Sequence, residues 1–189
     1  MPVRPPAMLV AGPPASGKTV LGNAIARRLG AALLDLDVLT RPLTAVVGAL
    51  LDTDDLDDAR LASATRNARY ETLYDAAADN LAIGNAVVLV APFTSERHSP
   101  DVWRAVAGRL ADAGGRPSLV WLRASPALLR DRMSTRAAGR DRAKLADVDA
   151  FLDRLDLDPP AVDHVAVDAA SPLEAQVSAV LDALPRLRQ

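Results

Sequence analysis

Residues 12–19 (GPPASGKT) fit the pattern G-x-x-x-x-G-K-[ST] at every fixed position. In this pattern the glycines let the backbone bend so that successive N–H groups face phosphate oxygens, and the dipole of the following helix favours the same negative charge. We expect Lys18 to reach the β- and γ-phosphates of ATP and Thr19 to place its hydroxyl on Mg²⁺. An apolar run before the motif and a helical pattern after it argue against a chance glycine-rich turn. The predicted nucleotide site consists of Gly12, Pro13, Pro14, Ala15, Ser16, Gly17, Lys18 and Thr19.

Two aspartates, Asp35 and Asp37, follow the second apolar run of the chain. On an extended segment, side chains two residues apart point to the same face. Phosphoryl transfer to a hydroxyl needs a carboxylate that orients and accepts the proton, and an acidic group that holds hydrated magnesium. We therefore predict that Asp37 is the base for the acceptor and that Asp35 binds magnesium through water. The alternative is that Asp37 caps a helix and the other aspartate is solvated.

The third apolar run ends at Ala91, where many enzymes with this phosphate-binding motif carry an aspartate. This departure leaves Thr19 and the two aspartates as the predicted magnesium environment. Hydroxyl groups and a guanidinium follow in the segment, and they favour an acceptor-binding role for Thr94 and Arg97. Ordinary loop capping is the competing interpretation.

Five apolar runs alternate with helical patterns along the chain. The runs predict buried strands at residues 7–11, 32–35, 86–91, 118–122 and 165–167. Apolar residues at helical spacing predict helices at 18–29, 42–51 and 57–83, and further helices follow the third, fourth and fifth strands. Strands that alternate with helices imply a parallel sheet covered on both faces, whose ligands bind beyond the carboxyl ends of the strands.

The chain has 189 residues, which suits a single domain over 1–189. A formal net charge of -2 gives no positive field for nucleic acid, so no nucleic-acid partner is expected. The sequence contains no cysteine, which favours an intracellular setting and excludes thiolate metal sites. No apolar stretch has the length of a membrane span, and no signal peptide is recognisable. We expect a cytoplasmic protein that is a monomer or a homodimer.

The combination of GPPASGKT, then LLDLDVLTRP, then an arginine-rich helix resembles the small P-loop kinases related to gluconate and shikimate kinase. Chloramphenicol phosphotransferase and other AAA_33-type ATP-binding proteins belong to the same group, and the resemblance covers nearly the whole chain. It implies a three-layer α/β/α P-loop kinase fold with five parallel strands in the order 2-3-1-4-5. It also implies a reaction that moves the γ-phosphate of ATP, with Mg²⁺, to a small molecule.

The resemblance further implies that an arginine-rich lid covers about residues 124–144. Within it, Arg132 and Arg136 are four residues apart and share one face of a helix, so both are expected to reach phosphate. Guanidinium groups there would stabilise the charge on the transferring phosphoryl group. The alternative is a solvated basic helix face.

In similar kinases the long third helix covers the acceptor site. This implies that Arg66, Arg69 and Tyr70 bind the acceptor, and arginine would suit a carboxylate or phosphate on it. Surface arginines beside a tyrosine at the edge of the core are the competing interpretation. The position of Asp168 resembles the loop that borders the adenine in these kinases.

Three functions fit the sequence. The first is an ATP- and Mg²⁺-dependent kinase whose acceptor is a hydroxyl of a sugar, sugar acid, natural product, antibiotic or nucleoside. The second is a regulatory ATPase without an acceptor, although no partner surface is evident in the sequence. The third is a polynucleotide-end kinase, which the acidic balance disfavours.

Overall fold

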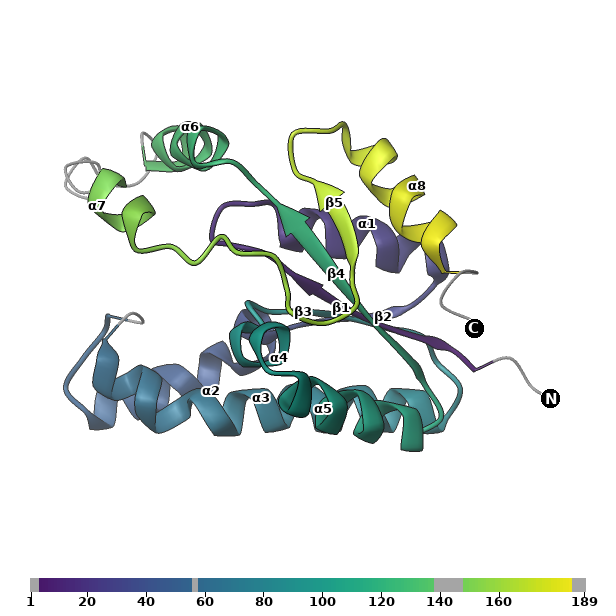
Figure 1. Ribbon diagram of the computed structural model, residues 1–189. Coiled ribbons are helices and arrows are strands. Elements are labelled where there is room, and N and C mark those ends of the chain that lie inside the picture. The colour runs from purple at the N-terminus through teal and green to yellow at the C-terminus, as the bar shows by residue number, and fades with distance from the viewer. Residues whose placement is uncertain (1–3, 56–57, 138–147, 185–189) are drawn as a thin grey trace.

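The structure, a computed structural model, describes residues 4–55, 58–137 and 148–184. Within these ranges five parallel strands form one sheet in the order β2-β3-β1-β4-β5, as predicted (Figure 1). The predicted three-layer α/β/α architecture is therefore confirmed. The strands are β1 (Pro6–Ala11), β2 (Ala32–Asp35), β3 (Val87–Val90), β4 (Arg116–Arg123) and β5 (Val165–Asp168).

The sheet separates two layers of helices, and the alternation of side chains along β1 shows how. Met8 and Val10 pack with the helices on one face, whereas Leu9 and Ala11 pack with the helices on the other, and all four are fully buried. A strand covered on both faces is apolar at every position, which explains the continuous apolar runs. The first layer consists of α1 (Lys18–Leu29), α6 (Pro126–Ala137), α7 (Val148–Asp153) and α8 (Leu173–Ala183).

The opposite layer consists of α2 (Leu36–Leu50), α3 (Ala59–Ala82), α4 (Thr94–His98) and α5 (Pro100–Asp112). Figure 1 shows α2 and α3 side by side along this face. Leu73, Ala77 and Leu81 of α3 are buried against the sheet together with Leu110 of α5. No helix in the described part of the chain is long and apolar enough to span a membrane.

Two elements differ from the sequence prediction. Helix α2 begins at Leu36, six residues before the predicted start, because the Asp35 carboxylate accepts hydrogen bonds from the backbone N–H groups of Asp37 (3.0 Å) and Val38 (3.3 Å). This is the N-cap geometry that stabilises a first helical turn. Helix α4 has only five residues, too few to show a periodic pattern.

Helix α1 lies close to the sheet because Gly22 faces β3. A Cβ atom at this position would be 2.5 Å from a methyl carbon of Val90, so any larger residue would push the helix away. The predicted end of α1 is also confirmed, since Gly30 adopts φ 61 and its N–H bonds back to the Ala26 carbonyl. Both glycines fix the helix that follows the phosphate-binding motif.

Candidate active site

The loop at residues 12–17 joins β1 to α1 at the carboxyl edge of the sheet. Gly17 and Ala15 adopt left-handed conformations, with φ of 98 and 60, and the Ser16 N–H closes a turn on the Pro13 carbonyl at 3.2 Å. A Cβ atom on Gly12 would be 2.7 Å from Ser16 Oγ, so the loop cannot close over a larger residue. This geometry fits the phosphate-binding loop that the motif predicts.

Lys18 and Thr19 occupy the first turn of α1. The Lys18 ammonium donates to the Pro13 carbonyl oxygen at 3.3 Å, so the side chain folds back over the loop. Thr19 Oγ1 donates to Asp35 Oδ2 at 3.1 Å. The helix N-terminus, the ammonium and the hydroxyl therefore lie together, as binding of phosphate and its counter-ion requires.

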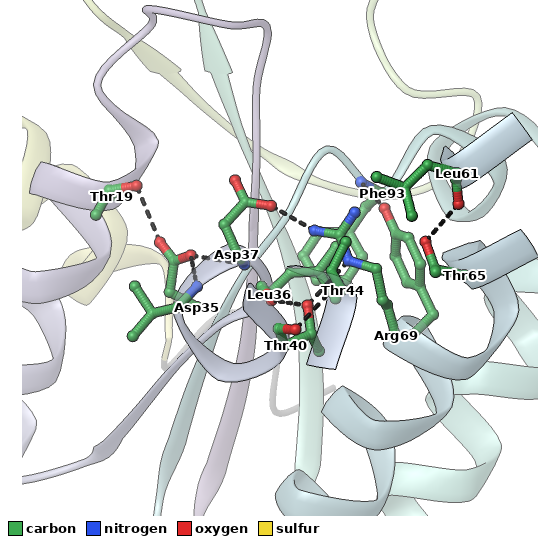
Figure 2. Close-up of polar contacts among 12 residues, drawn as sticks. Thr19, Asp35, Leu36, Asp37, Thr40, Thr44, Leu61, Thr65, Arg69 and Phe93 are labelled. Carbon is green, nitrogen blue, oxygen red and sulfur yellow. Dashed lines mark hydrogen bonds and ion pairs between the residues drawn. The ribbon is translucent and has the colours of Figure 1, made fainter. Parts of the chain in front are cut away.

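The two oxygens of Asp35 serve different neighbours, as Figure 2 shows. Oδ2 lies beside Thr19, whereas Oδ1 caps α2. The helix cap considered for Asp37 is thus supplied by Asp35 instead. Among the described residues no group of three His, Cys, Asp or Glu side chains could hold a metal ion. Mg²⁺ in phosphoryl-transfer sites needs no such group, because one or two protein oxygens, phosphates and water complete its shell; Thr19 and Asp35 fit that role.

Asp37 lies two residues further along, in the first turn of α2, and points toward α3 (Figure 2). Its Oδ1 accepts a 2.5 Å charge-assisted hydrogen bond from Arg69 Nη2, and Arg69 Nε donates to Thr40 Oγ1 at 2.9 Å. The side chain of Asp37 is 79% exposed, whereas that of Arg69 is 24% exposed. A half-buried arginine held at two points therefore orients an accessible carboxylate.

A cavity of about 250 Å³ opens beside this pair. Clefts of this kind are the usual sites for small molecules. Four residues predicted to bind the acceptor line this cavity, namely Asp37, Arg66, Arg69 and Tyr70. The last three lie about thirty residues after Asp37 in the sequence. The lining consists of Leu36, Asp37, Ala62, Ser63, Arg66, Arg69, Tyr70 and Pro92.

Tyr70 forms part of the wall of this cavity. Its phenol oxygen accepts a hydrogen bond from the Phe93 N–H at 3.2 Å, and the Arg66 guanidinium lies 5.4 Å from the centre of its ring. Burial, reinforced by the negative charge of Glu96, raises the pKa of Tyr70 to about 12. The phenol is therefore neutral at physiological pH and keeps its proton for hydrogen bonding.

Arg97, predicted to bind the acceptor, does not line the cavity. Its guanidinium donates to the carbonyl oxygens of Asp158 (2.7 Å) and Asp156 (3.1 Å), and it pairs with the Asp156 carboxylate at 2.5 Å. It also stacks over Trp121 at 4.6 Å and is only 4% exposed. Arg97 anchors the segment between α7 and β5. Thr94, predicted beside it, begins α4 half-buried and does not line the cavity.

Two further residues support the cavity and were not singled out in the sequence. Glu96 is 5% exposed, and its Oε1 accepts a 2.6 Å hydrogen bond from the Tyr74 hydroxyl. The Tyr74 ring packs 6.0 Å from the Tyr70 ring, so the pair backs the cavity wall. Burial, then the nearby Glu96 charge, raises the pKa of Tyr74. The one available signal was the spacing of four residues between the tyrosines, which places them on one helix face.

A second cavity, of about 550 Å³, adjoins the outer side of the phosphate-binding loop. Arg132 lines it, but its guanidinium donates to the carbonyl oxygens of Ser16 and Ala169, the latter at 2.7 Å. Arg132 thus joins the loop to the segment after β5. Contact with a transferring phosphoryl group stays a prediction. The role of Arg136 also stays a prediction. Arg136 lies in α6, but its side chain is outside the described ones. The segment 138–147 of the predicted lid is likewise outside the described residues.

Asp168 lies at the end of β5 and shapes the segment that borders this second cavity. The N–H of Ala170 and the guanidinium of Arg123 both donate to its carboxylate, at 2.9 and 3.1 Å, and these bonds lower its pKa. Asp168 does not itself line the cavity. Ser171, at the end of the segment expected to border the adenine, does line it, together with Leu173 and Gln176, for which the sequence suggested no binding role. This side of the site offers room for a nucleoside next to the phosphate loop.

A parallel sheet in the order 2-3-1-4-5 with a phosphate loop after its central strand defines a nucleotide-binding protein with the P-loop kinase fold. Residues 8–158 match the family model AAA_33, described as an AAA domain. The chain therefore belongs to the AAA_33 family. No curated protein matches the sequence.

Solved structures agree with this assignment. A gluconokinase from Sinorhizobium meliloti 1021 is 26% identical, with a TM-score of 0.60, and the match covers 98% of this chain and 95% of that one. A protein from Chloroflexus aurantiacus matches with 23% identity and a TM-score of 0.68, over 98% and 99% of the two chains. The APS kinase of Mycobacterium tuberculosis, in complex with AMPPNP and APS, matches with 20% identity and a TM-score of 0.60, over 97% and 99%. At these identities the last two show the shared fold.

Proposed function

We propose that the protein is an ATP- and Mg²⁺-dependent phosphotransferase that moves the γ-phosphate to a hydroxyl group of a small molecule. One observation carries the proposal: the start of α2 holds both Asp35, its N-cap, beside Thr19 of the phosphate site, and Asp37, at the mouth of the small cavity. A nucleotide site and an acceptor cavity thus meet at one helix start. Direct transfer requires this arrangement, because the attacking oxygen must lie in line with the phosphoryl group.

In the proposed reaction the acceptor hydroxyl gives its proton to the Asp37 carboxylate while its oxygen forms a bond to the γ-phosphorus. The bond between that phosphorus and the bridging oxygen of ADP breaks, and Lys18 balances the charge that develops on the phosphate oxygens. Bound Mg²⁺ would supply further charge neutralisation. Arg69 keeps the Asp37 carboxylate turned toward the cavity through the 2.5 Å bond.

The cavity favours an acceptor that carries an anionic group besides its hydroxyl. Arg66 and Arg69 both line it, and arginine binds carboxylate or phosphate through paired hydrogen bonds. The similarity to a gluconokinase supports a sugar acid as the first class to test. Neutral sugars, natural products and nucleosides follow.

A screen of hydroxyl acceptors with γ-labelled ATP and Mg²⁺ tests the proposal. We expect label to appear on one acceptor class, with the phosphate located on a hydroxyl by NMR, and we expect no transfer by Lys18→Ala. A steady ATPase rate that is indifferent to every acceptor would instead indicate a regulatory ATPase. The screen should therefore include sugar acids and the matching neutral sugars as pairs.

A further inference from the structure

Helix α2 carries its large apolar side chains on the face that points away from the protein. The face packed on α3 presents Thr40, Thr44 and Gly48, all buried. The outward face presents Leu43, 70% exposed, and Leu50, 79% exposed. A surface helix normally has the opposite polarity. We name Leu39, Leu43, Val46 and Leu50 the outer stripe; none of them lines the acceptor cavity or the nucleotide cavity.

The outer stripe is large enough to need an explanation. Leu39 is 37% and Val46 58% exposed, and Val38 beside the stripe is 63% exposed. At roughly 30 Å² per methylene-sized group, these five side chains expose roughly 300 Å² of apolar surface before the neighbouring exposed Pro42, Ala45 and Ala49 are added. Patches of this size on a monomer are often functional. Two such faces together would supply over a third of a standard interface of about 1,600 Å².

The spacing of the outer stripe is its own mirror image. Successive members are separated by four, three and four residues, the apolar repeat of paired helices. A second copy laid antiparallel about a two-fold axis between Leu43 and Val46 therefore sets Leu39 opposite the second copy's Leu50, and Leu43 opposite its Val46. Such reciprocal pairing is what a two-fold interface demands.

The charges at the two ends of α2 also favour an antiparallel pair. The segment that follows α2 is acidic, with Asp52 and Asp54 exposed. At the start of the helix the acids are balanced, because Arg69 pairs with Asp37 and Arg41 adds a cation. A parallel pair would set the two acidic segments against each other, whereas an antiparallel pair holds them apart by the helix length of about 22 Å.

We propose that the protein self-associates through the outer stripe, with the α2 helices of two copies packed antiparallel. Between Leu39 and Leu50 the helix contains a single charged residue, Arg41, so the stripe itself offers a partner mainly apolar contact. Because Asp35 caps α2 and Asp37 lies in its first turn, the second copy would stabilise the helix that positions them. The proposal does not depend on the proposed phosphotransfer, since association is measured without substrate.

Sedimentation velocity over a range of chain concentrations tests the association. We expect a monomer–dimer equilibrium, and we expect Leu43→Glu to raise the dimer dissociation constant at least about 100-fold, since each dimer loses two buried leucines. Ile83→Glu is the matched control, because Ile83 is 77% exposed but lies at the opposite edge of the sheet. A parent chain that stays monomeric at its highest soluble concentration would overturn the proposal. So would equal association of the two variants, each verified as folded by circular dichroism.

Cross-linking tests the relative orientation of the two α2 helices. Because the sequence contains no cysteine, any disulfide must form between the introduced residues. Under mild oxidation, Leu39→Cys alone should give no covalent dimer, because two copies of that position would lie about 16 Å apart, beyond the reach of a disulfide. An equal mixture of Leu39→Cys and Leu50→Cys chains should give one. Covalent dimer from Leu39→Cys alone, or none from the mixture, would overturn the antiparallel arrangement.

Discussion

The nucleotide side and the acceptor side of the site are built in different ways. The phosphate loop takes its groups from eight consecutive residues, and its shape depends on backbone torsions at Gly17 and Ala15. The acceptor cavity takes side chains from α2, α3 and the segment after β3, which come together only in the folded chain. A contiguous motif can thus specify one half of a site, whereas packing between distant helices specifies the other.

One side chain belongs to both halves. Asp35 turns Oδ2 toward Thr19 of the nucleotide side, and its Oδ1 starts the helix that carries Asp37. The comparison therefore predicts that substitutions among the nucleotide-binding residues should affect ATP only. Substitutions in the acceptor cavity should affect the acceptor only. Four substitutions test this separation of the two sides, from the largest expected effect to the smallest.

Asp37→Asn should give the largest change, a loss of about 10³-fold in kcat with unchanged ATP affinity, because an amide cannot accept the acceptor proton. Rapid-mixing transfer assays and calorimetric ATP binding measure the two quantities. Asp101→Asn is a matched control, since Asp101 is also exposed and paired with an arginine, Arg104, at 2.7 Å. Full transfer activity in Asp37→Asn would show that Asp37 is not the base. The functional separation between the nucleotide side and the acceptor side would then lose its main support.

Arg97→Met should lower the free energy of unfolding by about 3 kcal/mol while leaving the KM for the acceptor unchanged. The buried guanidinium satisfies two carbonyl groups and the Asp156 carboxylate, all outside the cavity. Urea unfolding followed by tryptophan fluorescence gives the stability. A strongly raised acceptor KM in folded protein would indicate that Arg97 contributes to acceptor binding.

Arg69→Ala should reduce kcat/KM for the acceptor by about 10- to 100-fold, the usual worth of a hydrogen bond to a charged group. Arg69→Lys should recover little, because one ammonium cannot hold Thr40 and Asp37 as the guanidinium does. Arg66→Lys is the comparison variant; its hydrogen bond to Ser95 is long, at 3.4 Å, so a smaller loss is expected. A change in ATP affinity in Arg69→Ala would contradict the separation.

Arg132→Ala should have the smallest effect, a loss of about 10-fold in ATP affinity with no change in acceptor KM. The side chain ties the phosphate loop to Ala169, so its removal loosens the nucleotide side alone. Arg130→Ala, on the same helix, provides the control. A drop in kcat larger than the drop in affinity would show that Arg132 also contacts the transferring phosphoryl group.

Much of the fold was predictable because it rests on local patterns. The apolar runs gave five strands, Gly30 gave the end of α1, and the motif gave the phosphate loop. The start of α2 was missed because Asp35 was assigned to magnesium alone, although its second oxygen caps the helix. The role of Arg97 was missed because its partners lie about sixty residues away, and charge in a sequence says nothing about burial. Glu96 and Tyr74 were missed because the sequence does not show that this carboxylate and phenol, 22 residues apart, are buried together.

The two-sided role of Asp35 has a consequence for engineering. Since the nucleotide half ends at this residue, a library confined to the cavity positions Ala62, Ser63 and Arg66 would vary the acceptor pocket without touching a phosphate contact. Every clone would keep the same donor chemistry, so differences in product formation would report on acceptor selectivity alone. Small residues at two of the three positions leave space to be filled, which makes the fold a practical starting point for evolving kinases with chosen substrates.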